Sequence, residues 1–171
     1  MHLKPFTYLT ITLLTKQNAD GTPAYLTTPK MVAEFEVTID SLYETVNQEY
    51  GYEASLADIT YDVKNFEDRG VVIKFQGYSS TLPSFVRLFV DTMHKHSKTP
   101  FSDSIVKVAT EKLFKQYKNA NVDVYGRCNN NRLLHLVPHK HHSNLVEKEL
   151  KKMMDGLEIL EPSKILSWIL G

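Results

Sequence analysis

The chain has 171 residues, and its twenty Lys and Arg residues balance twenty Asp and Glu residues, so the formal net charge is zero. A balanced charge means that the chain lacks the excess of basic residues that binds nucleic acid or an anionic membrane surface, and we expect neither partner. Domains commonly hold about 100 to 200 residues, so the length predicts one domain around one buried core.

A single cysteine, Cys128, excludes an internal disulfide and suits a reducing compartment, so we expect a cytoplasmic location. No run reaches the roughly 18 apolar residues that cross a bilayer. The N-terminal stretch MHLKPFTYLTITLLT is broken by threonines and lacks the small-residue cleavage site of a signal peptide. Met1 and His2, directly before a strand-like segment, would fit a natural protein that extends further upstream.

Threonine alternates with apolar residues from Phe6 to Leu14, which predicts a strand, and Lys16 to Thr27 has the composition of a surface loop. Thr28 is predicted to cap a long helix whose first turn contains Pro29, because proline needs no backbone donor there. The buried face of this helix is predicted from apolar residues at helical spacing, namely Phe35, Ile39, Leu42 and Val46. We expect the helix to end near Tyr50, with a tight connection through Ala54, Leu56 and Ala57.

A β-hairpin is predicted next, because two runs alternate apolar and polar residues around a polar link from Asn65 to Gly70. Gly70 is expected to supply a positive φ at the end of that link. A turn is predicted over Gly77 to Ser84. The alternating apolar residues are Ile59, Tyr61 and Val63 on the first strand and Val71, Ile73 and Phe75 on the second.

Helical spacing continues beyond the hairpin. A second helix is predicted from Phe85 to near His96, and a third helix, capped by Ser102, carries Val106, Ala109, Leu113 and Tyr117 on one face. Asn119 to Gly126 is predicted to break the pattern. A weaker helix is expected up to Pro138, another from Ser143 or Asn144 to Gly156, and a final apolar helix within residues 157–171.

The segment from Glu53 to Tyr61 reads E-A-S-L-A-D-I-T-Y, and Gly77-Tyr78 is followed by a proline-containing turn and an amphipathic helix. This order resembles the M16 metallopeptidases, the family of insulin-degrading enzyme and pitrilysin, and specifically the third of their four related αβ domains. In that domain the matching segment reads E-A-x-L-A-G-L-x-Y, so Asp58 stands where the family pattern has glycine. The resemblance covers roughly residues 5–160 and is strongest from Ser41 to Met93.

The resemblance and the count of elements imply an α+β fold, with several helices packed on a small antiparallel or mixed sheet. We expect residues 1–156 to form one M16 middle-type αβ domain. We expect residues 157–171 to begin a further element whose packing partner lies outside this chain, so that the domain is truncated.

The family binds zinc through an H-x-x-E-H motif on a helix, with a distal glutamate as third ligand. None of the seven histidines of this chain has that spacing, so the chain should be inactive alone and need no cofactor itself. The resemblance implies a zinc endopeptidase whose metal sits in its first domain, while the third and fourth domains form the opposite wall of a chamber that encloses peptides. Its implied partners are the other domains of the same polypeptide and the peptide substrates.

Three histidines within four residues, His139, His141 and His142, are the one metal-like cluster in the sequence. Zinc sites usually draw their ligands from rigid, separated positions, so the pattern favours a solvated loop between helices over a metal site. His94 and His96 diverge on a helix, and the pattern favours a fraying helix end over a metal pair. Cys128 could act as a nucleophile with His135, but a lone cysteine is more often a small buried apolar residue.

Two further groups of side chains are ambiguous. Tyrosines near the hairpin could bind a peptide but more often pack in or beside a core, and three glutamates suggest a solvated helix face. These residues are Tyr43, Tyr50, Tyr52, Tyr61 and Tyr78, and Glu44, Glu49 and Glu53.

Two functions therefore stay open. The chain is either a non-catalytic domain of an insulinase-like endopeptidase or a stand-alone interaction module with the same fold. Exposed apolar surface around Ile159 to Leu170 is expected in the first case, because an interface would have been cut away. A self-contained chain would favour the second.

Overall fold

The computed structural model describes residues 5–14, 26–66, 70–136, 140–156 and 162–170. Within these ranges the chain forms six helices and one three-stranded sheet, which confirms the predicted α+β class. In chain order the elements are β1 (Phe6–Leu14), α1 (Pro29–Leu56), β2 (Thr60–Asn65), β3 (Gly70–Tyr78), α2 (Leu82–Lys98), α3 (Asp103–Val122), α4 (Val124–Leu136), α5 (Ser143–Met154) and α6 (Pro162–Leu170).

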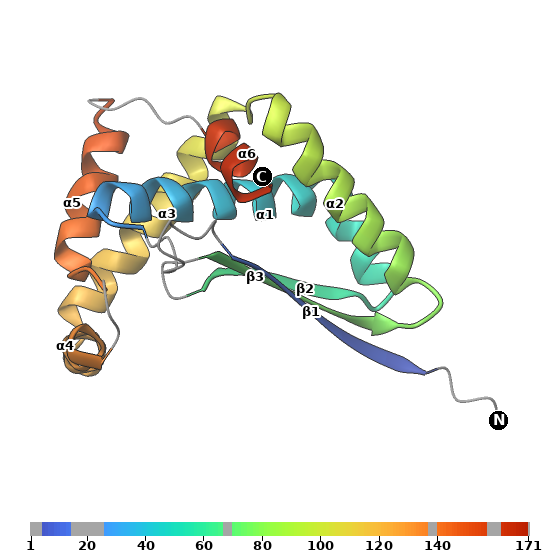
Figure 1. Cartoon of the computed structure of the whole chain (residues 1–171), viewed down its shortest axis with the longest axis horizontal. Coiled ribbons are helices and arrows are strands. Elements are labelled where there is room, and N and C mark those ends of the chain that lie inside the picture. Colours follow the sequence, from blue (N-terminus) through green and yellow to red (C-terminus); the bar gives the residue numbers. More distant parts are fainter. Residues whose placement is uncertain (1–4, 15–25, 67–69, 137–139, 157–161, 171) are drawn as a thin grey trace, which may run out of the picture.

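The sheet has the strand order β1-β3-β2, and both pairings are antiparallel rather than mixed. Its register places Leu9 opposite Phe75 and Ile11 opposite Ile73, so the apolar side chains of neighbouring strands share one face. Figure 1 shows α1, α2 and α6 above that face, while no described helix covers the other. The alternation of threonine and apolar residues in β1 follows from this one-sided cover.

Helix α1 begins as predicted, because the Thr28 hydroxyl accepts a hydrogen bond from the backbone N–H of Met31 at 3.2 Å and Pro29 follows. Its predicted end near Tyr50 is wrong, since the helix continues to Leu56. Gly51 is the only weak helix former in that stretch, and one glycine costs a helix about 1 kcal/mol, which packing elsewhere outweighs.

The hairpin is confirmed, but the predicted role of Gly70 is wrong. Gly70 lies in β3, and Gly156 is the only described glycine with a positive φ. A Cβ atom at position 70 would lie 2.2 Å from the carbonyl oxygen of Leu13. Glycine is therefore required there by the close approach of β1. The predicted turn from Gly77 is also shorter, because Gly77 and Tyr78 belong to β3 and α2 starts at Leu82.

The predicted break from Asn119 to Gly126 shrinks to one residue. Helix α3 continues to Val122 and α4 starts at Val124. The Asp123 carboxylate accepts a hydrogen bond from the backbone N–H of Gly126 at 2.6 Å, so one aspartate restarts the helix. The hydroxyl of Ser102 pairs with that of Ser104 at 2.8 Å and makes no cap bond. Val137 and Pro138 lie outside the described residues.

The core lies between the sheet and the helices. The rings of Phe75 and Phe89 pack edge to face with centroids 5.2 Å apart, which joins β3 to α2. Val146 and Leu150 of α5 are also fully buried against this core. None of the described helices is both long enough and apolar enough to cross a membrane.

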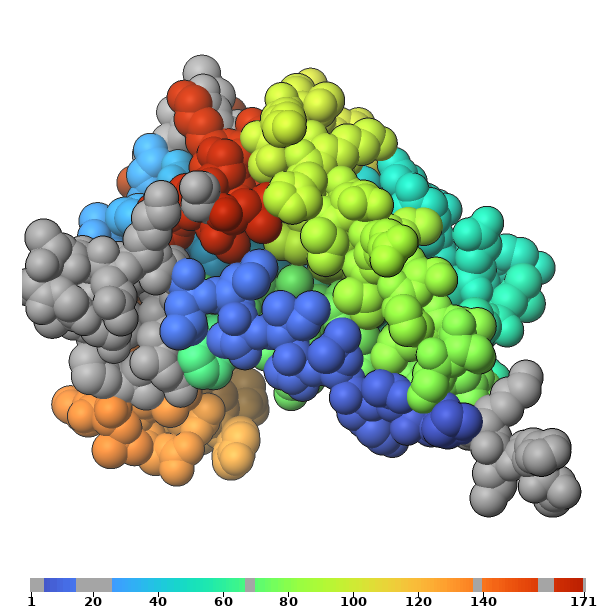
Figure 2. All heavy atoms as spheres, turned by 45° about the vertical axis from the view of Figure 1, so that its right-hand side comes forward, coloured from blue at the N-terminus to red at the C-terminus, as the bar shows by residue number. Residues whose placement is uncertain are grey.

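Helix α6 finds packing partners within the chain. Its residues Leu166 and Ile169 are buried, and the helix contacts α1, α2 and β1. Figure 2 shows α6 beside α2, with β1 running along the same side of the molecule. No large apolar side chain in 162–170 is exposed, contrary to the expectation for a cut interface, although residues 159–161 lie outside the described ranges. Several exposed apolar side chains lie instead around α4, namely Val122, Val124, Tyr125 and Leu136.

Candidate functional site

The outer edge of β2 borders a groove. β2 pairs only with β3 in the described sheet, so its other edge is unpaired there. Residues of α1 and α3 lie across the groove from this edge. One hollow of about 520 Å³ is lined by residues 62–65 of β2, and a second of about 710 Å³ by residues 60 and 61. Both hollows are also lined by Tyr43 of α1, so they adjoin along the whole strand.

One face of α1 forms the side of this groove. Glu36, Asp40, Tyr43, Asn47 and Gly51 follow at spacings of four, three, four and four, which places them on one stripe of a helix. The large apolar residues Phe35, Leu42 and Val46 of α1 lie outside this stripe and are buried in the core. The same amphipathic pattern therefore positions both the core and the groove.

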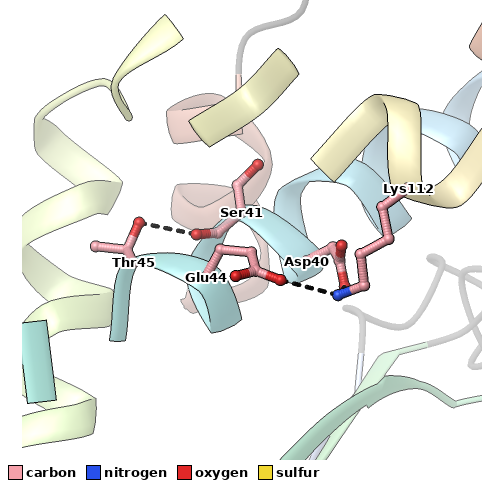
Figure 3. Close-up of polar contacts among 5 residues, drawn as sticks. All are labelled: Asp40, Ser41, Glu44, Thr45 and Lys112. Carbon is pink, nitrogen blue, oxygen red and sulfur yellow. Dashed lines mark hydrogen bonds and ion pairs between the residues drawn. The ribbon is translucent and has the colours of Figure 1, made fainter. Parts of the chain in front are cut away.

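A lysine from α3 joins the carboxylates of this stripe. The ammonium of Lys112 lies 3.1 Å from Asp40 Oδ1 and 2.9 Å from Glu44 Oε1 (Figure 3), and 5.4 Å from the centroid of the Tyr43 ring. The Lys112 side chain is 37% exposed and each carboxylate 20%, so water screens the contacts only in part. One ammonium thus serves two carboxylates, and the group keeps a net negative charge.

Burial shifts the titration of these groups. It raises the pKa of Asp40 above its ordinary value, although the hydrogen bond and the charge of Lys112 oppose the shift. Burial alone would lower the pKa of Lys112, but hydrogen bonds with Glu44 and Asp40 outweigh it, so this pKa is raised. Asp40 Oδ2 is buried and has no hydrogen-bond partner among the described residues. The carboxylate of Asp40 is therefore incompletely compensated.

Glu36 links three elements at the far end of the groove. Its Oε1 accepts a hydrogen bond from Asn65 Nδ2 at 3.2 Å, and its Oε2 accepts one from the Tyr117 hydroxyl at 2.8 Å. These bonds tie α1 to the end of β2 and to α3. The walls of the groove are consequently held at a fixed spacing.

Tyr61 closes the groove toward the core. Its ring lies 5.3 Å from that of Tyr43 and 5.2 Å from that of Phe85, measured between centroids. Burial raises the pKa of Tyr61 to about 12, with smaller contributions from Tyr43 and Glu44. The hydroxyl is buried without a hydrogen-bond partner among the described residues, so Tyr61 serves as an apolar surface here.

The histidine cluster is only partly described. His139 lies outside the described residues, while His141 is half-buried, with Nε2 3.1 Å from the carbonyl oxygen of Leu26. His142 is exposed at the start of α5. Within the described residues, no group of three or more His, Cys, Asp or Glu side chains could hold a metal ion. The choice between a metal site and a loop stays a prediction.

Other candidate residues fall outside the groove or inside the core. His94 is exposed and His96 is buried, so the two side chains diverge on α2. Cys128 and His135 are both exposed on α4, and the prediction of a buried cysteine is wrong. Tyr52 is 77% exposed and does not pack as predicted, whereas its four companions Tyr43, Tyr50, Tyr61 and Tyr78 are half-buried.

The glutamate face also divides. Glu53 is exposed as predicted, and Glu49 lies 3.5 Å from Lys95. Glu44 departs from the prediction, because it is part of the Lys112 group.

Sequence reasoning missed Asp40 and Lys112, yet one signal was present. Glu36, Asp40 and Glu44 recur at intervals of four, and three like charges on one helix stripe require a cation or a solvated cleft nearby.

The groove is suited to binding. Its described lining contains carboxylates, two lysines, tyrosines and amides, with no histidine or cysteine to act as base or nucleophile. The unpaired strand edge offers backbone donors and acceptors in a row. An extended polypeptide is the ligand that such an edge accommodates.

Comparison with known proteins gave one family match. The family model described as "Middle or third domain of peptidase_M16" matches residues 21–149, which include α1, the hairpin and most of α5. No curated protein matches the chain.

Proposed function

The chain belongs to the M16 peptidase family as a middle or third domain, and on that basis we propose that it is a non-catalytic part of an insulinase-like zinc endopeptidase. In this proposal the domain forms part of the chamber wall opposite the zinc site and contacts peptide substrates. The single observation that carries the proposal is the family match over residues 21–149 in a sequence without H-x-x-E-H.

The residues present do not fit the family's zinc. The sequence lacks the two histidines at the required spacing, and the described part of the chain brings no three ligating side chains together. In this proposal the zinc-dependent bond-breaking step uses groups outside this domain. The contribution of the domain is to hold and orient peptide.

Peptide contact is tested in the complete polypeptide by photo-crosslinking. A peptide substrate carrying a benzophenone side chain is bound after chelation of zinc, irradiated and mapped by mass spectrometry. We expect cross-links within residues 21–149. Cross-links confined to the rest of the polypeptide would overturn the proposal.

The isolated chain is tested with a quenched fluorescent peptide, with and without chelator. We expect no hydrolysis in either case. Chelator-sensitive hydrolysis that purifies with the chain and disappears when His139, His141 and His142 are replaced by alanine would mean that this domain has its own metal chemistry.

A second candidate is a stand-alone, non-catalytic interaction module of the same fold. The packing of Leu166 and Ile169 favours it, because the described residues of α6 leave no large apolar side chain exposed. Immunoblotting of source cells with an antibody to this chain separates the two functions. A band near 19.6 kDa supports the module, whereas a band several times larger supports the peptidase domain.

A further inference from the structure

We propose that the groove along β2 binds an extended polypeptide segment carrying lysine or arginine, which adds to the sheet as a fourth strand. This inference rests on the proposed function and deepens it, since it names the surface that receives the peptide and the chemistry of the peptide. The partner is one extended strand with cationic side chains.

The hydrogen-bonding pattern shows which backbone groups of β2 are available. The N–H of Phe66 donates to the carbonyl oxygen of Gly70 at 2.8 Å, and these two residues continue the register of the β2-β3 pair. In an antiparallel pair every second residue bonds across the ladder, so the intervening residues turn their N–H and C=O groups outward. Tyr61 and Val63 therefore turn their backbone groups toward the groove.

The space beside this edge is long enough for an added strand. A six-residue strand such as β2 is about 20 Å long, and hollows border it from residue 60 to residue 65. Side chains of an added strand would point alternately toward the helices and toward the open sheet face. On the helix side they meet the stripe of α1, and on the open side they meet Asp62 and Lys64.

The charge of the lining selects a basic segment. Four carboxylates line the two hollows, from Glu36, Asp40, Asp58 and Asp62, against the ammonium groups of Lys64 and Lys112. Both lysines are already engaged, Lys64 with Asp62 at 2.7 Å and Lys112 with Asp40 and Glu44. The Asp40 carboxylate also keeps one buried oxygen without a partner. On the open side Asp62 is balanced by Lys64 and by Lys74, its register partner on β3. A cationic side chain therefore gains attraction on the helix side of the added strand.

The other edge of the sheet is a poorer receptor. β1 is the second edge strand, but Phe6 is the only described β1 residue that lines either hollow, and α6 contacts this strand. The binding edge is thus β2, and a bound peptide should affect β1 much less.

The test uses the chain itself and fluorescein-labelled peptides of about nine residues, matched in length to β2 and its margins. One peptide alternates threonine with lysine, one alternates threonine with glutamate, and one is the lysine peptide with alternate backbone nitrogens methylated. We expect the lysine peptide to bind at least about tenfold tighter than either of the others, because the second lacks charge complementarity and the third lacks edge donors. Equal binding of all three peptides, or binding of none, would overturn the proposal.

Site and charge are then tested separately. Amide hydrogen exchange of the chain should slow at Tyr61 and Val63 when the lysine peptide binds. Asp40→Asn, which removes the incompletely compensated carboxylate, should weaken binding about threefold or more, whereas Asp91→Asn, the same change on the exposed face of α2, should leave it unchanged. Protection confined to β1, or equal effects of the two variants, would contradict a site at β2.

The experiments distinguish a failure of the groove proposal from a failure of the proposed function. If the groove is wrong but the domain still contacts substrate, photo-crosslinks in the complete polypeptide will fall on other faces of residues 21–149. If the chamber role is wrong, the cross-links will avoid these residues while the isolated chain still binds the lysine peptide.

Discussion

The backbone N–H of Ile59 donates a hydrogen bond to the carbonyl oxygen of Ala54 at 2.9 Å, and this bond closes the end of α1. A second bond joins the N–H of Asp58 to the carbonyl oxygen of Ser55 at 3.2 Å. Together they form a Schellman motif, which requires a left-handed residue just past the helix. Asp58 has φ 52 and is the only described non-glycine residue with a positive φ.

Replacing Asp58 by glycine should therefore stabilise the chain. Glycine adopts the left-handed conformation without steric cost, and part of that gain is lost to the greater freedom of the unfolded chain, so we expect about 0.5–1 kcal/mol. Urea unfolding measures the change. Asp58→Ala is the comparison and should lower stability, because alanine has the same steric cost but no polar side chain to hydrogen-bond locally in the left-handed conformation. Equal effects of both variants would exclude backbone conformation as the cause.

Replacing Lys112 by methionine should destabilise the chain by about 1–2 kcal/mol. The change leaves Asp40 and Glu44 without their cation, but partial exposure keeps the loss below the 3–5 kcal/mol of a fully buried pair. The control is Lys115→Met on the exposed side of the same helix, which should change the free energy of unfolding by less than about 0.5 kcal/mol. The prediction fails if the two variants are equally stable.

Stability should depend on pH through His96. Its ring stacks on Phe101 with centroids 4.5 Å apart, and burial, assisted by the charge of Lys95, lowers its pKa while Glu49 opposes the shift. The unfolded chain therefore takes up a proton near pH 6.5 before the folded chain does. Stability is full above that pH and falls as the pH drops from 6.5 toward the lower folded pKa.

The two histidines of α2 provide the measurement. Free energies of unfolding at pH 7.5 and 5.5 should converge in His96→Phe, which keeps the aromatic stack without a titrating group. His94→Phe removes an exposed histidine and should retain the wild-type difference. If His94→Phe loses the difference and His96→Phe retains it, the pH dependence comes from His94 and the prediction is wrong.

Two glycines should respond oppositely to alanine. Gly70→Ala should cost about 2 kcal/mol or more, because the new methyl group would meet the Leu13 carbonyl oxygen and push β1 away from β3. Gly51→Ala meets only the end of the Asn47 side chain, which can turn aside, and should gain up to about 1 kcal/mol of helix propensity. Thermal unfolding of both variants shows whether each one gains or loses stability. The prediction is contradicted if Gly51→Ala loses as much stability as Gly70→Ala.

The packing of α6 is tested by Leu166→Ala. Leu166 is 1% exposed, so its truncation should cost about 2–5 kcal/mol. Leu145→Ala on α5, where the side chain is 42% exposed, should cost less than about 1 kcal/mol. If Leu166→Ala is as mild as Leu145→Ala, the helix does not dock on α1 and α2 in solution.

The periodic features of the sequence predicted most of the elements. β1 was bounded correctly because alternation over nine residues is unambiguous, and Thr28 with Pro29 marked the start of α1. The family pattern also pointed to a structural fact at position 58. Where the pattern that the segment resembles has glycine, this chain has an aspartate with a positive φ.

The remaining features depend on contacts between distant residues. Lys112 meets carboxylates 72 and 68 positions earlier in the chain. The spacing of the carboxylates indicates that a cation is needed, but it does not show which one. Gly70 was assigned to a turn because the neighbouring strand that excludes a side chain lies far away in sequence. The groove itself exists only because β2 is at an edge, which depends on strand order rather than on the composition of any strand.

The strand order β1-β3-β2 also bears on how the protein is made. β2 and β3 are neighbours in sequence and can pair soon after synthesis, but β1 leaves the ribosome before its only partner in the described sheet exists. Until β3 emerges, the nascent chain carries a nine-residue strand with both edges unsatisfied. Nascent chains stalled just before β3 should therefore depend on chaperones more than chains stalled at any other point.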